Sequence, residues 1–146
     1  MNNHSTYAGD ISCQEAWDIL KGGQLAFLVD VRTQAEWAFV GLPVLQEVGS
    51  EPLLVEWQSY PTMDRNLGFA EILSDTLTAK GADTDAHLLF LCRSGVRSQA
   101  AAMAMTASGY RNCYNVAGGF EGPPDNKGHR GLTGGWKAVG LPWAQS

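Results

Sequence analysis

Residues 88–100 decide the fold of this chain, and they read Leu-Leu-Phe-Leu-Cys-Arg-Ser-Gly-Val-Arg-Ser-Gln-Ala. The first four residues form an unbroken apolar run, which is typical of a strand buried on both faces of a parallel sheet. Alanines dominate the segment 98–108, which we predict to be a helix that ends at Gly109. Cys92 is therefore expected at the carboxyl end of a strand, where open parallel sheets bind their ligands.

The loop between this strand and this helix surrounds a thiol with groups that attract anions. Arg93 and Arg97 are cationic, and Gly95 allows the backbone to turn its amides inward. The helix start adds unpaired N–H groups and the positive end of the helix dipole. A lone cysteine that ends a strand is usually a small buried hydrophobe. These neighbours instead favour a thiolate nucleophile at Cys92, with room for an anion beside it.

Segments on both sides of this stretch alternate between strand and helix patterns. Ser12 and Glu15 form a potential capping box for a helix that stops at Gly22–Gly23. The alternation predicts an α/β domain with a central, mostly parallel sheet flanked by helices. The other predicted segments are strands 25–31 and 113–116, a short helix 33–40 capped by Thr33, an edge strand 42–48, an irregular stretch 49–62, a helix 67–80 with Leu67, Ala70, Ile72, Leu73 and Leu77 buried, a loop 118–135 and a helical turn 136–140.

Length and composition favour one domain over residues 1–146, because 45% of the residues are apolar and 17% are charged. The net charge of -5 offers no basic face for nucleic acid. No apolar stretch approaches the roughly 20 residues that a membrane helix needs. The polar start, Met1–Asp10, has no apolar core of a secretory signal. The expected location is therefore the cytoplasm.

The remaining cysteines and the histidines carry weaker signals. Cys113 lies in a predicted strand and is expected in the core, although a role as a resolving thiol stays open. Cys13 falls in the first turn of a helix and is expected to be structural. An odd number of cysteines without a Cys-x-x-Cys pair suits a reducing compartment. His4, His87 and His129 lack ligand spacing, so we expect no metal and no cofactor.

The loop Cys92–Arg97 resembles the active-site loop of the rhodanese family. Further matches occur in order along nearly the whole chain, and together with the loop they are specific. They imply a three-layer rhodanese-like domain. The matching segments are Ile11-Ser12 with the helix that follows, Asp30-Val31-Arg32 with Glu36-Trp37, Tyr110, Asn115-Val116, Gly118-Gly119-Phe120, and Trp136 with Gly140-Leu141-Pro142.

The resemblance implies a sulfurtransferase in which Cys92 takes sulfur from a small anionic, thiosulfate-like donor and passes it to a thiol or cyanide. Arg97 would orient the donor and Arg93 would assist. The amides of Ser94, Gly95, Val96 and Arg97 would line the substrate pocket. Asp30 and Arg32 either support the loop or form an ordinary ion pair, and the sequence weighs these two equally.

Three departures from the family pattern leave the donor and the acceptor open. Residues 40–43 lack the family's histidine, residues 48–65 form a longer stretch, and Glu121–Gly134 is a predicted loop insertion. One alternative is a persulfide relay or sulfur carrier for a partner protein. A second is a cysteine phosphatase or arsenate reductase. Tyrosine-type phosphatases have a Cys-x5-Arg loop, whereas Cys92 to Arg97 is one residue shorter, which suits a single sulfur atom better.

Overall fold

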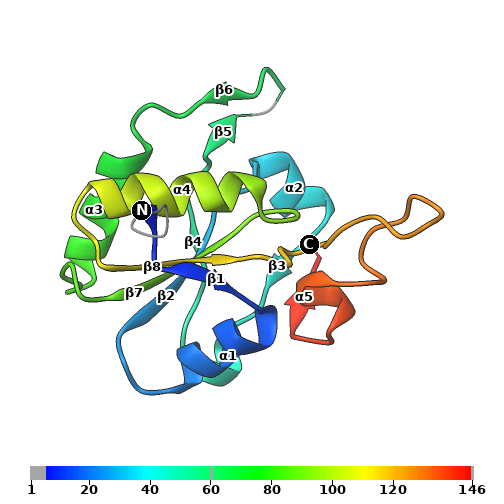
Figure 1. Ribbon diagram of the computed structural model, residues 1–146, viewed down its shortest axis with the longest axis horizontal. Helices are drawn as coiled ribbons and strands as arrows, with labels where there is room; N and C mark the ends of the chain where they lie inside the picture. The colour runs from blue at the N-terminus through cyan, green and yellow to red at the C-terminus, as the bar shows by residue number, and fades with distance from the viewer. Residues whose placement is uncertain (1–5, 60, 146) are drawn as a thin grey trace.

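A central sheet of parallel strands organises the computed structural model, which describes residues 6–59 and 61–145. His4 and the first half of the polar start lie outside these residues. The sheet runs in the order β1-β8-β7-β2-β4 (Figure 1). Its strands are β1 (Gly9–Ile11), β2 (Ala26–Asp30), β4 (Leu53–Leu54), β7 (His87–Leu91) and β8 (Asn112–Val116).

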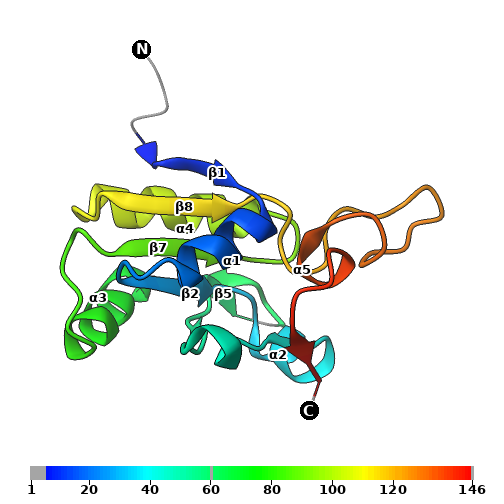
Figure 2. The ribbon, with the colours of Figure 1, turned by 90° about the horizontal axis from the view of Figure 1, so that it is seen from below.

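Helices cover both faces of the sheet and make three layers. Helices α1 (Cys13–Lys21) and α5 (Gly135–Ala138) pack on one face, and α3 (Phe69–Ala79) and α4 (Val96–Ala107) pack on the other (Figure 2). Successive side chains of β2 alternate between the layers, since Phe27 and Val29 join the α3/α4 cluster while Leu28 joins the α1 cluster. The α/β class with a central parallel sheet is confirmed.

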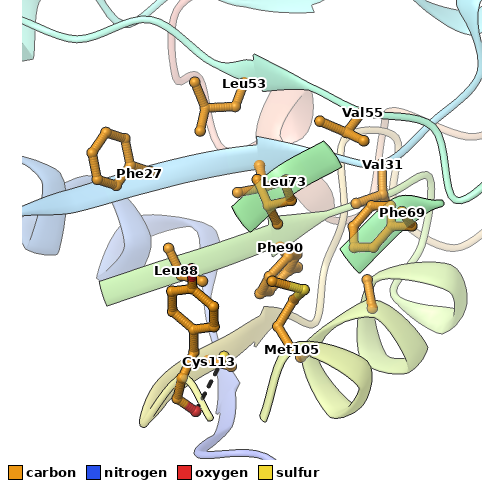
Figure 3. Packing of buried hydrophobic residues seen from close by; sticks show 14 of the residues in the cluster. Phe27, Val31, Leu53, Val55, Phe69, Leu73, Leu88, Phe90, Met105 and Cys113 are labelled. Carbon is orange, nitrogen blue, oxygen red and sulfur yellow. Dashed lines mark hydrogen bonds between the residues drawn. The ribbon is translucent and has the colours of Figure 1, made fainter. Parts of the chain in front are cut away.

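The core between the sheet and the α3/α4 layer is built from large side chains opposite small ones. Phe90 of β7 lies among Leu73 of α3 and Met105 of α4 (Figure 3). Ala101 and Ala102 are fully buried, so α4 approaches the sheet closely. Burying a side chain such as Phe90 or Leu73 stabilises the fold by roughly 1.5–3 kcal/mol. This packing fixes the start of α4, and with it the loop that contains Cys92.

Local capping signals place the two helices that follow β1 and β2. Ser12 and Glu15 form the predicted capping box of α1, and Gly22 ends that helix. Thr33 caps α2 (Gln34–Phe39), with its hydroxyl accepting from the amide of Glu36. The carboxylate of Glu36 accepts in return from the Thr33 amide at 3.1 Å. Both predicted helices are thus confirmed within one or two residues.

The prediction for residues 42–62 is wrong in two places. The edge strand 42–48 shortens to β3 (Leu42–Pro43), which pairs antiparallel with β9 (Trp143–Ala144), and Gln46–Val48 forms the 3₁₀ helix η2. Pro43 has no amide hydrogen to extend such a strand. The stretch 49–62 is not wholly irregular: it contains β4, which joins β2, and β5 (Gln58–Ser59), which pairs with β6 (Asp64–Arg65).

The predicted buried face of residues 67–80 is also wrong in part. Leu67 is 89% exposed and Ile72 is 48% exposed, whereas Phe69, Leu73 and Leu77 are buried. Leu67 is exposed because α3 begins at Phe69 and Leu67 lies before it, whereas Ile72 lies within α3 but outside its buried face of Phe69, Leu73 and Leu77. Among the described residues, no helix is long and apolar enough to cross a membrane.

Candidate active site

Cys92 lies where the chain connections of the sheet diverge. From β2 the chain leads to β4 on one side, and from β7 it leads through α4 to β8 on the other. Such a switch point leaves a crevice at the carboxyl ends of the strands. A cleft of about 760 Å³ opens there, and its walls include Glu36, Phe39, Met63, Arg93, Val96 and Arg97.

The sulfur of Cys92 accepts a hydrogen bond from the backbone at the start of α4. The Gly95 amide donates to Sγ at 3.1 Å, and the Ser98 hydroxyl oxygen lies 3.2 Å from the same sulfur. Gly95 adopts φ = +112°, and a Cβ there would lie 2.7 Å from the carbonyl oxygen of Ala117. Only glycine therefore turns this amide toward the sulfur without strain. The predicted role of Gly95 in shaping the loop agrees with this geometry.

A turn after β8 holds the other side of the loop. The Phe120 amide donates to the carbonyl of Cys92 at 2.8 Å, and the amides of Glu121 and Gly122 donate to the carbonyl of Arg93 at 3.0 and 3.1 Å. Gly119, at φ = +69°, packs so closely on Arg93 that a side chain would collide with its main chain. The Gly118-Gly119-Phe120 segment thus clamps the cysteine loop from outside.

Arg97 forms a bidentate ion pair with Glu36 of α2. Its two terminal nitrogens donate to Oε1 and Oε2 at 2.7 and 2.9 Å. Burial favours neutral Glu36, but the hydrogen bonds and the charge of Arg97 outweigh burial and lower the pKa of this carboxyl. Burial likewise opposes the charge of Arg97, and the pairing with Glu36 raises its pKa. The predicted anion-binding Arg97 therefore already has a carboxylate partner.

Arg93, Ser94 and Val96, which the sequence predicts to bind substrate, also line the cleft. Arg93 is exposed, and it takes part in no salt bridge within residues 6–59 and 61–145. Val96 is 77% exposed at the first turn of α4. The loop therefore offers one unpaired cation beside an exposed apolar side chain.

Asp30 and Arg32 do not line the cleft. Both are fully buried, and the Arg32 guanidinium binds Asp30 through Nε and Nη2 at 2.9 and 2.7 Å. Arg32 Nη2 also donates to the carbonyl of Gly41 at 2.8 Å, and the guanidinium lies 4.1 Å from the ring centre of Phe120. The pair thus joins the end of β2 to the end of α2 and to the clamping turn, as a support would.

The other predicted residues lie apart from the cleft. Cys113 and Cys13 are buried and free of disulfides, and burial raises the pKa of each thiol to about 11. The ring of His87 stacks on Tyr114. Within the described part of the chain, no three His, Cys, Asp or Glu side chains gather as a metal site requires.

The rhodanese-like domain family matches residues 12–122. The chain belongs to this family. The crystal structure of Rv0390 from M. tuberculosis superposes with a TM-score of 0.85 at 46% identity, over 96% of this chain and 99% of that one.

Sequence relatives of this rhodanese-like protein fall into two groups. The uncharacterized RP600 homologue of Rickettsia rickettsii is 40% identical over 134 residues, which is 92% of this chain and 95% of the relative. A thiosulfate sulfurtransferase, GlpE of Haemophilus influenzae, is 28% identical over 113 residues, 77% of this chain and 85% of that protein. Of these two relatives, only GlpE has a name that states an activity.

Sequence reasoning missed two features of the rhodanese-like site. Phe39 and Met63 reach the cleft from α2 and from the β5–β6 turn, and no spacing rule connects them to Cys92. The sequence predicts Ser98 only as a helix start, yet its hydroxyl touches the sulfur. A polar residue directly after Arg97, one helical turn beyond Gly95, was the available signal for that contact.

Proposed function

We propose that this rhodanese-like protein is a sulfurtransferase that carries sulfane sulfur as a persulfide on Cys92. The observation that carries the proposal is the position of Sγ at the start of α4, where the Gly95 amide donates to it beside a cleft. A backbone N–H aimed at the sulfur favours an anion at this point, either the thiolate or the terminal sulfur of a persulfide.

The proposed reaction has two displacement steps at sulfur. The Cys92 thiolate attacks the outer sulfur of a thiosulfate-like donor; a new S–S bond forms, and the donor's own S–S bond breaks as sulfite leaves with the electron pair. A thiolate or cyanide acceptor then attacks the outer sulfur, and Cys92 leaves as thiolate. The thiol proton of a protonated acceptor passes to solvent, so the cycle balances.

Charged residues around the loop take separate roles in this proposal. Arg93 is the exposed cation that meets a donor anion, whereas Arg97 offers its charge while held by Glu36. Asp30 and Arg32 support the loop from behind and do not touch substrate. Removing one partner of such a buried pair costs about 3–5 kcal/mol, which would loosen the loop without changing its chemistry.

Mass spectrometry after treatment with thiosulfate tests the assignment. We expect one added sulfur atom on the peptide that contains Cys92, and its loss when cyanide is added. The Cys113→Ser variant is the matched control and should take up the same single sulfur. Sulfur found on Cys113 in place of Cys92 would disprove the proposal. Hydrolysis of para-nitrophenyl phosphate without any sulfur transfer would instead support the phosphatase alternative.

The cleft favours an acceptor thiol attached to an apolar group or to a protein segment. Phe39 is 79% exposed and Val96 is 77% exposed, and both line the cleft together with Met63. Two arginines and two glutamates, Glu36 and Glu121, also line the cleft, so the positive and negative charges of its walls balance. A volume of about 760 Å³ lies in the range of sites for organic ligands, far beyond the needs of cyanide.

Paired acceptors distinguish these possibilities. Phe39→Ser should slow sulfur transfer to benzyl mercaptan about tenfold, because burial of an aromatic side chain is worth on the order of 1–3 kcal/mol. Transfer to cyanide should stay within about twofold. Leu67→Ser is the control, since Leu67 is as exposed but does not line the cleft. Equal loss with both acceptors would refute the preference for an apolar thiol.

Three free thiols fit a cytoplasmic location, which we also propose.

A further inference from the structure

A buried chain of hydrogen-bonding groups connects Cys92 to the edge of the sheet. The Ser98 hydroxyl lies 3.2 Å from Cys92 Sγ and 2.5 Å from Oδ1 of Asn115 on β8. The Asn115 amide nitrogen donates to the carboxylate of Asp10 on β1 at 3.1 Å. Asp10 and Asn115 are direct neighbours in the β1–β8 register. Ser98 and Asn115 are both buried, and Asp10 is exposed.

The donors and acceptors in this chain allow one direction only. A carboxylate accepts, so the Asn115 amide must present its nitrogen to Asp10 and its oxygen to Ser98. An amide oxygen also only accepts, so the single hydroxyl hydrogen of Ser98 points at Asn115. Ser98 then presents a lone pair to the sulfur, where the S–H of a neutral Cys92 can donate. With these orientations, the hydrogen-bonded groups are complementary to a neutral Cys92 thiol.

Formation of the thiolate reverses the last contact. A thiolate has no hydrogen to give, so a Ser98 hydroxyl turned toward Asn115 would face it with a lone pair. Rotation of the hydroxyl about its Cβ–Oγ bond brings a second donor to the sulfur, beside the Gly95 amide. That rotation breaks the bond to Asn115 Oδ1. The strength of the Ser98–Asn115 bond therefore opposes ionisation of Cys92.

We propose that Ser98 is a catalytic residue whose hydroxyl accepts from the Cys92 thiol and donates to its thiolate, and that Asn115 is a positioning residue that sets which of the two it does. The inference rests on the proposed role of Cys92 as the nucleophile. During the second displacement, the same hydroxyl stabilises the thiolate that leaves from the persulfide. The proton that Cys92 loses on ionisation passes to solvent.

A double-mutant cycle tests the Ser98–Asn115 coupling. The variants are Asn115→Leu, Ser98→Ala and the two together, and the readout is the rate of Cys92 alkylation by iodoacetamide between about pH 5 and pH 9. Asn115→Leu frees the Ser98 hydroxyl to donate to sulfur. Below the plateau of the pH-rate curve it should speed alkylation roughly three- to tenfold, the equivalent of one hydrogen bond.

The result in the Ser98→Ala background decides the question. There, Asn115→Leu should change the rate by less than about twofold, because no hydroxyl remains to turn. The charges of Arg97, Glu36, Arg93 and Asp30 near the site are the same in all four proteins, so their effects cancel. An equal acceleration without Ser98, or none with it, would overturn the proposal.

A surface variant covers the case in which Asn115→Leu fails to fold. Asp10→Ala removes an exposed carboxylate and lets the Asn115 amide turn its nitrogen toward Ser98. Alkylation should accelerate in the same direction by a smaller factor, and Asp18→Ala, which removes an exposed carboxylate on α1, should leave it unchanged. Equal effects of Asp10→Ala and Asp18→Ala on the alkylation rate would contradict the proposed coupling through Asn115 and Ser98. Alkylation needs no donor, so a persulfide that failed to form would refute the proposed function separately.

Discussion

Cys92, directly after β7, and Cys113, on the neighbouring strand β8, are buried cysteines with opposite surroundings. They are 1% and 0% exposed, and both contact the α3/α4 layer. The thiol of Cys113 donates to the carbonyl of Tyr110 at 3.8 Å (Figure 3), whereas the sulfur of Cys92 accepts from the amide of Gly95. Burial raises the pKa of Cys113 to about 11. Exposure therefore does not separate the two; the direction of the backbone hydrogen bond does.

Exchanging each sulfur for oxygen gives the largest expected difference. Cys92→Ser should lower thiosulfate:cyanide transfer by at least about a thousandfold, because a hydroxyl cannot form the persulfide. Cys113→Ser should keep most of the activity. Steady-state assays with circular dichroism as a check on folding measure both. Loss of transfer in Cys113→Ser, with activity kept in Cys92→Ser, would show that Cys113 is the nucleophile.

Selective labelling sharpens the same contrast. With a pKa of about 11, only about one Cys113 in a thousand is ionised at pH 8. Iodoacetamide should therefore modify Cys92 first, and Cys113 only on unfolding. Peptide mass spectrometry in the native state and in urea measures the order. Rapid native labelling of Cys113 would show that it behaves as an accessible redox thiol.

Gly95→Ala removes the backbone geometry that distinguishes Cys92. A Cβ at this position would lie 2.7 Å from the Ala117 carbonyl, and φ = +112° is strained for alanine. We expect a loss of about 1–3 kcal/mol in the free energy of unfolding and a larger, roughly hundredfold, loss of transfer as the amide leaves the sulfur. Gly109→Ala, a positive-φ position with open space at the end of α4, is the control and should lose stability alone.

The smallest effect concerns stability at alkaline pH. Burial raises the pKa of Cys113 from 9.0 to about 11, so the folded protein favours the neutral thiol. The stabilisation of the folded state by neutral Cys113 is complete below about pH 9, and it is lost as the pH rises through about 11. The free energy of unfolding in urea should fall over that interval, and less steeply in Cys113→Ala. An unchanged slope would mean that Cys113 does not titrate with unfolding.

The central part of the fold was predictable from sequence, and the edges of the sheet were not. β2 and β7 carry apolar runs because helices cover both of their faces. The edge strands β1 and β4 have three and two residues, too few for any periodic pattern. Their place in the sheet follows from pairing with β8 and β2, which only the folded chain shows.

The site divides in the same way. Cys92 to Arg97 are neighbours in sequence, so their shared loop was visible there. The ion pair of Glu36 with Arg97 spans 61 positions and the contact of Ser98 with Asn115 spans 17. Such pairs depend on which strand ends meet. Local sequence therefore indicates the loop, whereas the pairing of Arg97 with Glu36 follows only from the folded chain.

The clamp after β8 has a consequence for repeated turnover. It fixes the carbonyls of Cys92 and Arg93 with three main-chain amides, from Phe120, Glu121 and Gly122. The conformation of the loop is thus held by hydrogen bonds within the folded protein. A loop held in this way needs no reorganisation between turnovers, because folding has already oriented its hydrogen-bond donors.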